Sequence, residues 1–159
     1  MAFVKSIGRD NVEFIEEPVR DPRDLEAFIR ETGFEVALDE TMWDDTCGNL
    51  RLLPGVSVWV IKPTLIGLLG SVDLIRAAAD QHKDCVVSSS FESSVGSRML
   101  AHLASLTDRE TGMGPCDWFS ENLLGPLRAD HASVIPARNK QYLWDDIERS
   151  LLTRMCTCS

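Results

Sequence analysis

Residues that can bind a metal ion or take part in proton transfer recur at a regular spacing in this chain. Glu16 and Asp39 each follow a short apolar run, and they are 23 residues apart. Lys62 follows the next apolar run after another 23 residues, and Ser88 follows a fourth run after 26. Carboxylate oxygens are preferred ligands of Mg²⁺, and a lysine that ends an apolar strand can act as a fixed cation or have its pKa lowered by desolvation. The spacing indicates one site built from repeating units.

The acids come in adjacent pairs, Glu16-Glu17 and Asp39-Glu40. Side chains alternate between the two faces of a strand, so only one acid of each pair can face a common site. Two carboxylates on neighbouring strand ends suit Mg²⁺, which binds through one or two carboxylates and keeps several waters. The alternative is that these acids are solvated loop residues, and the pattern alone leaves both interpretations open.

A serine-rich segment, SSSFESS (88–94), joins an apolar run to a helical pattern. Backbone amides and hydroxyls at a helix N-terminus bind anions, so Ser88 and Ser89 are candidates for binding a substrate carboxylate. An N-cap cluster without a ligand is the alternative, and the composition is compatible with both. The chain has no GxSxG motif, so we predict no hydrolase nucleophile here.

Strand and helix patterns alternate along the chain, which favours parallel βαβ units. The expected strands are 12–15, 36–38, 56–61 and 85–87, with a less well defined one at 117–119. Asp21-Pro22 and Gly33 mark the start and the end of the first helix. Further helices are expected at 68–82, 94–106 and 140–155. The apolar period predicts an inner face of Leu68, Val72, Ile75 and Ala79 on the first of these, and of Val95, Met99, Leu100 and Leu103 on the second, with His102 among core positions.

A period near 25 residues, with each strand ending in a polar group, is typical of a (β/α) barrel, in which active-site groups lie at the carboxyl ends of the strands. An open doubly wound sheet alternates similarly, but the chain has no glycine-rich phosphate loop. Four or five strands do not close an eight-stranded barrel of about 250 residues. We therefore predict an α/β chain that forms part of a TIM-type barrel, with a smaller open α/β domain as the alternative.

The composition narrows the classes of partner. The 159 residues carry a net charge of −9, which argues against a nucleic-acid partner. No apolar run approaches the roughly 20 residues that cross a bilayer, and the N-terminus has neither a signal-peptide nor a transit-peptide pattern. The five cysteines are an odd number, which favours a reducing compartment. Cys85 is expected to be a core thiol, and Cys156 and Cys158 lack partners at metal-ligand spacing.

Four segments together carry a resemblance to a known family: IEEP (15–18), ALDE (37–40), VIKPTLIG (60–67) and SSSFESS (88–94). They resemble the o-succinylbenzoate synthases of the enolase superfamily, over the barrel portion from about the fourth to the eighth strand. The resemblance runs from about residue 3 to about residue 120. The plant form, which is part of a multifunctional phylloquinone-pathway protein in plastids, is the most similar in pattern.

The resemblance implies a role for each candidate residue. Glu16 and Asp39 match metal-binding residues of the fourth and fifth strands, with Mg²⁺ as the ion. Lys62 matches the catalytic lysine of the sixth strand. Ser88 and Ser89 match the region that contacts the succinyl carboxylate. The implied reaction is the dehydration of 2-succinyl-6-hydroxy-2,4-cyclohexadiene-1-carboxylate, a small-molecule carboxylate, to o-succinylbenzoate in menaquinone or phylloquinone biosynthesis.

The chain also departs from the family pattern. The family's KxK motif, which supplies the proton-removing lysine, and its first metal-binding aspartate are expected before residue 1. The isolated chain is therefore expected to be inactive.

Two non-catalytic alternatives remain, an α/β interaction domain and a truncated gene product. The open edges of a partial barrel predict self-association or pairing with an N-terminal half-barrel. Residues 1–138 are predicted to form the barrel segment and 139–159 a helical tail. The plant resemblance implies a plastid location, and otherwise a cytoplasmic one is expected.

Overall fold

The computed structural model describes residues 8–43, 49–114, 119–124, 129–130 and 133–134. The chain divides into two compact units, and each is described by itself. The first unit comprises Met1–Ile61, Val72–Val86 and Thr107–Glu110, and the second comprises Lys62–Ser71, Val87–Leu106 and Thr111–Ser159. A search of the described helices finds none that is long and apolar enough to span a membrane. The predicted helix at 140–155, and with it the tail at 139–159, lies outside the described residues.

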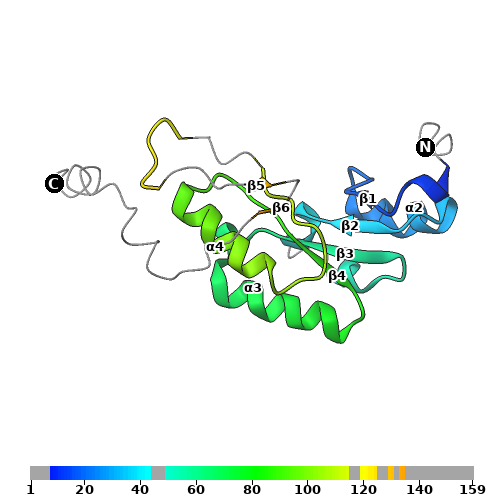
Figure 1. The fold of residues 1–159 in the computed structure, drawn as a ribbon. Helices are drawn as coiled ribbons and strands as arrows, with labels where there is room; N and C mark the ends of the chain where they lie inside the picture. The colour runs from blue at the N-terminus through cyan, green and yellow to red at the C-terminus, as the bar shows by residue number, and fades with distance from the viewer. Residues whose placement is uncertain (1–7, 44–48, 115–118, 125–128, 131–132, 135–159) are drawn as a thin grey trace. The chain divides into compact units, whose positions relative to one another are not determined.

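The core of the fold is a four-stranded sheet in the order β1-β2-β3-β4 (Figure 1). Its strands are β1 (Ile15–Glu16), β2 (Val36–Leu38), β3 (Val56–Ile61) and β4 (Asp84–Val87). The β1–β2 and β2–β3 pairs are parallel, and the order along the sheet follows the order along the chain. This is the arrangement that consecutive βα units of a barrel produce, and the predicted fold class is confirmed.

Both faces of the central strands are covered. Every residue of β2 is buried, and Val56, Val58 and Trp59 of β3 are each 1% exposed. Ala37, Val58 and Val60 form a cluster on one face, against which Phe14 and Val86 pack. We refer to these five residues as the apolar cluster. Burial on both faces explains why these strands are near-continuous apolar runs rather than alternating ones.

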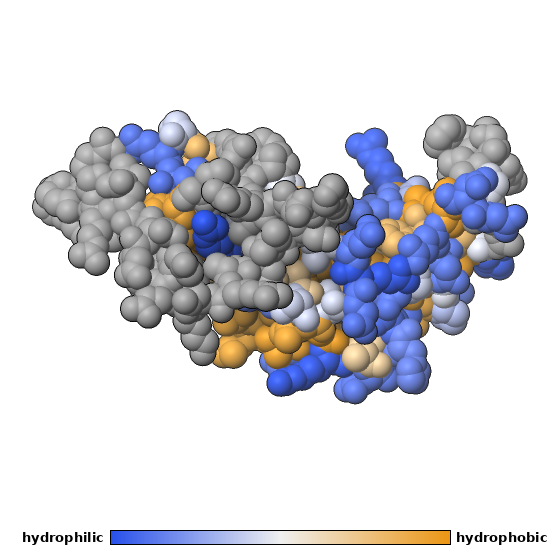
Figure 2. Space-filling view, viewed as in Figure 1, coloured by the Kyte–Doolittle hydropathy of each residue, from blue (hydrophilic) through white to orange (hydrophobic). Residues whose placement is uncertain are grey.

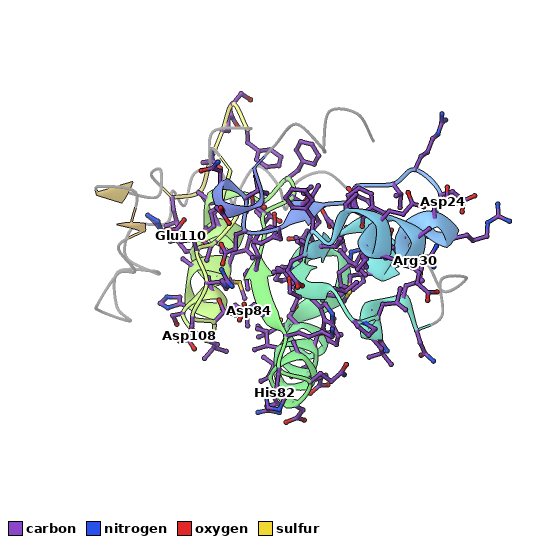
Figure 3. All side chains as sticks on the ribbon, turned by 90° about the vertical axis from the view of Figure 1, so that its right-hand side faces the viewer. Asp24, Arg30, His82, Asp84, Asp108 and Glu110 are labelled. Atoms are coloured by element: carbon purple, nitrogen blue, oxygen red, sulfur yellow. The ribbon has the colours of Figure 1, made fainter. Side chains whose placement is uncertain are left out.

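The first helical segment begins after Asp21 and ends at Gly33, as the sequence predicts. The side chain of Asp21 accepts a hydrogen bond from the amide of Arg23 at the start of η2 (Pro22–Asp24), and α2 (Leu25–Thr32) follows. The hydrogen bonds from Arg23 lower the pKa of Asp21 to about 2. Gly33 closes the helix at φ 65, a left-handed conformation that favours glycine. Asp24 and Arg30, labelled in Figure 3, are exposed residues of this segment.

Two predicted segments are shifted in the structure. The first strand is Ile15–Glu16 rather than 12–15, because residues 12–14 make no ladder with β2. The helix predicted at 68–82 is α3 (Pro63–Asp80), which begins earlier and is interrupted at Gly67, with φ 78 and ψ 164. The predicted buried stripe on this helix is wrong at Leu68, which is 52% exposed. Ser71 and Ala78 are the fully buried positions instead.

The helix predicted at 94–106 is α4 (Ser94–Ala104). Met99 was expected to point inward and is 53% exposed, and His102, expected among core positions, is also exposed. Figure 2 shows apolar side chains at the surface in the region of α3 and α4. The strand predicted at 117–119 falls mostly outside the described residues. The remaining short elements are η1 (Arg9–Asn11), η3 (Glu40–Trp43), η5 (Leu50–Leu52), β5 (Ala129–Asp130) and β6 (Ser133–Val134), of which the last two pair antiparallel.

An arginine far along the chain joins the edges of the first unit. Arg109 donates hydrogen bonds to Glu13, which precedes β1, and to Asp84 at the start of β4, labelled in Figure 3. Its Nη2 atom lies 2.5 Å from Oδ2 of Asp84. The hydrogen bonds to Glu13 and Asp84 raise the pKa of Arg109. Arg109 thus links the residue two before β1 to the first residue of β4, although the two acids are far apart in the sequence.

Candidate functional site

The first two candidate residues lie at the carboxyl ends of adjacent parallel strands. Glu16 is the last residue of β1 and pairs with Ala37, and Asp39 directly follows β2. Parallel strands lie about 4.8 Å apart and rise about 3.3 Å per residue, which places the Cα atoms of Glu16 and Asp39 roughly 8 Å apart. Glu16 follows Phe14 by two residues and Asp39 follows Ala37 by two, so alternation assigns both side chains to the face of the apolar cluster.

Asp39 is a buried acid, with an exposed fraction of 5%, whereas Glu16 is exposed. Among the buried polar atoms that the structure describes, Oδ1 of Asp39 accepts no hydrogen bond, although the residue has other interactions. A buried carboxylate beside an exposed one, both with hard oxygen atoms, matches the donors that a divalent cation takes. In the described part of the chain, no three His, Cys, Asp or Glu side chains cluster as a metal site.

The second acid of the first pair has a role that the sequence did not reveal. Oε1 of Glu17 accepts hydrogen bonds from the backbone amides of Asp39 at 2.8 Å and Thr41 at 2.9 Å. Oε2 accepts a third from the hydroxyl of Thr41 at 2.7 Å. These three hydrogen bonds from residues 39–41 to Glu17 fix the position of the segment that directly follows β2. The signal in the sequence was the pairing of the acids itself, which indicated two different environments but not a contact across 22 residues.

Lys62 directly follows β3 and precedes Pro63, the first residue of α3. Pro63 is buried and Lys62 is partly buried, so the proline anchors the lysine between a strand and a helix. Proline is favoured at the first position of a helix because its missing N–H needs no partner there. Lys62 is followed by Thr64, whose hydroxyl donates a 2.5 Å hydrogen bond to Oε1 of Glu92. This hydrogen bond fixes the first turn of α3 directly after Lys62.

The hydroxyls of Ser88 and Ser89 bind the segment that follows α4. Ser88 forms a parallel bridge with Gly112. The hydroxyls of both serines donate to the carbonyl of Gly112, at 3.3 and 3.2 Å, and the hydroxyl of Ser89 accepts a 2.8 Å bond from the amide of Gly114. A Cβ atom on Gly112 would lie 3.0 Å from Oγ of Ser88, so a larger residue at this position would have to displace the Ser88 side chain.

The start of α4 is capped by the protein itself. Ser93 is the N-cap and accepts from the amide of Gly96, while the amide of Ser94 donates to Oδ1 of Asn122 at 3.0 Å. These contacts match the N-cap cluster that was the alternative to an anion site at this helix. Glu92, only 6% exposed, accepts from the amide of Ser90 at 2.7 and 2.9 Å as well as from Thr64. Sequence reasoning missed this connection between the serine segment and the start of α3.

A groove of about 160 Å³ in the second unit is not a second candidate for chemistry. It is lined by Pro63, Thr64, Leu68, Gly96, Met99, Leu100 and Leu103. None of these side chains is ionisable, so the groove has no group for acid–base catalysis or for binding a metal ion. Among the sequence-predicted residues, Glu16 and Asp39 lie in the first unit, and Lys62, Ser88 and Ser89 lie in the second.

Comparison with known proteins identifies the relatives of this chain. The o-succinylbenzoate synthase of Vibrio cholerae is 35% identical over 148 residues, which covers 89% of this chain and 45% of that protein. The chain is a relative of the o-succinylbenzoate synthases. "Protein PHYLLO, chloroplastic" of Arabidopsis thaliana is 34% identical over 152 residues, which covers 79% of this chain and 9% of that protein. The chain thus spans about half the length of the synthase that it matches. No family model matches the chain.

Solved structures agree on the fold. MenC from Desulfotalea psychrophila superposes with a TM-score of 0.67 at 21% identity, covering 82% of this chain and 39% of MenC. A probable mandelate racemase from Alicyclobacillus acidocaldarius superposes with a TM-score of 0.72 at 24% identity, covering 91% of this chain and 40% of its own. The fold of the chain is therefore that of a segment of these two proteins. The o-succinylbenzoate synthase relationship predicted from the four sequence segments is confirmed by the curated relatives.

Proposed function

We propose that this chain supplies the part of an o-succinylbenzoate synthase active site that carries two metal ligands and a catalytic lysine. The observation that carries the proposal is the placement of Glu16 and Asp39 at the ends of adjacent parallel strands, in a chain 35% identical to a synthase. The substrate would be 2-succinyl-6-hydroxy-2,4-cyclohexadiene-1-carboxylate, and the product o-succinylbenzoate. The barrel segment would comprise residues 1–138.

A regular feature of the register supports the choice of residues. Glu16, Asp39, Lys62 and Ser88 each come two residues after a member of the apolar cluster, namely Phe14, Ala37, Val60 and Val86. Residues two apart on a strand share a face. Glu17, with a φ of 42, and Glu40, the first residue of η3, have already left the extended conformation, so this alternation does not place them on that face. The pattern therefore selects one acid from each pair without reference to any relative.

The relationship to this family implies a divalent metal ion, and we propose that it is Mg²⁺. Glu16 and Asp39 would hold it, since both present hard oxygen atoms and Asp39 is a buried carboxylate. When bound, the ion supplies Lewis-acid stabilisation of the negative charge that develops on the substrate carboxylate. The burial of Asp39 limits the access of water to that side of the site, which strengthens its interaction with a cation.

We propose that Lys62 acts as a fixed cation. In the dehydration, the C–H bond α to the ring carboxylate breaks and its proton passes to a base. The C–O bond to the adjacent hydroxyl then breaks, and the hydroxide leaves as water with the proton that the base had taken up. The ammonium group of Lys62 would stabilise the negative charge that builds up after the first step. The family's base belongs to a KxK motif, which this sequence lacks, so we assign the base to no residue of this chain.

Ser88 and Ser89 are proposed to lie beside the succinyl carboxylate of the substrate. Their hydroxyls already bind Gly112 and Gly114, so their contribution would be to shape this segment rather than to offer freely rotating donors. The partner would be a small-molecule dicarboxylate. The name of the Arabidopsis relative supports a plastid location if the source is a plant.

A chimera tests the proposal. This chain replaces the aligned 148 residues of the Vibrio cholerae enzyme, and o-succinylbenzoate formation is followed with and without Mg²⁺. We expect Mg²⁺-dependent turnover that falls by about 10³-fold or more in Lys62→Ala, because a fixed charge is removed from the reacting centre. The exposed Arg76→Ala is the matched control and should leave the rate unchanged. Equal activity of the Lys62→Ala chimera and its parent would contradict the assignment.

A further inference from the structure

Glu17 and the segment 39–41 are joined by three hydrogen bonds that close a 22-residue loop of chain. The carboxylate of Glu17 accepts from the amides of Asp39 and Thr41 and from the hydroxyl of Thr41. These bonds hold the backbone of Asp39 at the point where β2 ends. Because the direction of a side chain follows from its backbone, Glu17 also limits where the carboxylate of Asp39 can point.

The backbone of Glu17 is itself adapted to this contact. Its φ is 42, in the left-handed region that few residues other than glycine adopt. The chain therefore turns between the two acids, while the amide of Glu17 still donates to the carbonyl of Ala37 at 3.1 Å. A conformation of this kind persists where surrounding contacts over-determine it, and here the three bonds to 39–41 do so.

We propose that Glu17 is a positioning residue that holds Asp39 for metal binding. The inference rests on the proposed function, in which Asp39 is a metal ligand. The proposal is that metal affinity depends on the hydrogen bonds that the oxygens of Glu17 accept, and not on the negative charge of Glu17. Groups that orient a metal ligand typically contribute 10-fold to 100-fold to metal affinity.

Two substitutions separate acceptor from charge. In Glu17→Gln, the amide oxygen can still accept from the amides of Asp39 and Thr41, and the NH₂ group can donate to the hydroxyl of Thr41. In Glu17→Ala, all three bonds are lost. Glu31→Gln, an exposed acid on α2, controls for the loss of one negative charge. Asp39→Asn tests the metal ligand directly.

The measurement is Mn²⁺ binding to the chimera with the Vibrio cholerae enzyme, because this chain alone is not expected to carry every metal ligand of the family. Electron paramagnetic resonance of the free ion follows binding, and circular dichroism verifies that each variant is folded. We expect Glu17→Ala to weaken binding at least 10-fold, with Glu17→Gln within about threefold of the parent and Glu31→Gln unchanged. Equal weakening by Glu17→Gln and Glu17→Ala would show a direct or electrostatic role and overturn the inference.

The failure of the proposed function gives a different result. If the parent binds Mn²⁺ no more tightly than Asp39→Asn, then Asp39 is not a ligand, and both proposals are wrong. If Asp39→Asn weakens binding while Glu17→Ala does not, only the positioning role of Glu17 is overturned. The Glu17→Gln variant keeps the test valid should Glu17→Ala fail to fold.

Discussion

The carboxylate of Glu17 accepts a 2.8 Å hydrogen bond from the backbone amide of Asp39, 22 residues later in the chain. This bond joins the acid that follows β1 to the acid that follows β2. Neighbouring parallel strands in a barrel are joined by the sheet and the intervening helix, so a direct link between their carboxyl ends adds order where we propose the metal site. Order at this point is what a catalytic constellation requires.

The Glu17 contact predicts slow amide hydrogen exchange at Asp39 and Thr41. In Glu17→Ala both amides lose their acceptor, and a lost hydrogen bond costs about 1 to 2 kcal/mol, or roughly 5-fold to 30-fold in exchange rate. Hydrogen exchange followed by NMR measures each amide separately. The amide of Gly33, which donates to the carbonyl of Ile29, should be unaffected. A uniform increase at all three amides would instead indicate global destabilisation.

The bond between Thr64 and Glu92 predicts a specific loss of stability. Thr64→Val removes one donor to a carboxylate that is 6% exposed, and we expect unfolding to become easier by about 1 to 3 kcal/mol in a urea titration. Thr64→Ser keeps the hydroxyl and should recover most of this loss. If Thr64→Val and Thr64→Ser are equally stable, the hydrogen bond contributes nothing measurable.

Two glycine substitutions should have opposite effects on the free energy of unfolding. Gly70→Ala places a methyl group in helix α3, 3.9 Å from Cβ of Ile66 and clear of other side chains, and should stabilise by about 0.5 to 1 kcal/mol. Gly55→Ala places a methyl group 2.4 Å from Cγ2 of Ile29 at a φ of 90, and should destabilise by about 2 kcal/mol or more. Thermal unfolding of the two variants measures both effects, and a stable Gly55→Ala would contradict the turn before β3.

Burial raises the pKa of the Cys85 thiol from 9.0 to about 12, with a further contribution from Asp84. Between pH 9.0 and about 12, the thiol stays protonated in the folded chain but loses its proton in the unfolded chain. The contribution of the buried thiol to the stability of the fold is therefore fully present below pH 9.0 and declines as the pH rises towards 12. At pH 8 we expect iodoacetamide to label Cys85 slowly in the folded chain and rapidly in urea, as measured by peptide mass spectrometry. Rapid labelling of the folded chain would contradict the burial.

The sheet was predictable from the sequence because its strands are buried on both faces. The runs 36–38 and 56–61 match β2 and β3 residue for residue, since a fully buried strand allows no polar interruption. The start of the edge strand β1 was misplaced by three residues, because Val12 and Phe14 are apolar without pairing. Phe14 packs against the apolar cluster, so its apolar side chain reflects core packing rather than strand pairing.

The helices were predicted less accurately than the central strands. The first part of α3 was missed because Gly67 interrupts the helix, and the sequence indicated only the part after it. The inward face of α4 was half right, with Leu100 and Leu103 buried and Met99 exposed, because a hydrophobic period does not state which neighbour a helix packs against. The contacts of Glu17 and Glu92 were invisible for a related reason, since each joins segments more than 20 residues apart.

Metal dependence of the chimera between this chain and the Vibrio cholerae synthase tests the central claim most directly. Turnover is measured against Mg²⁺ concentration for the parent chimera, Glu16→Gln, Asp39→Asn and the exposed control Glu31→Gln. We predict that Glu16→Gln and Asp39→Asn each lose turnover by about 10³-fold or require far more Mg²⁺, while Glu31→Gln matches the parent. Unchanged Mg²⁺ dependence in both Glu16→Gln and Asp39→Asn would contradict the account.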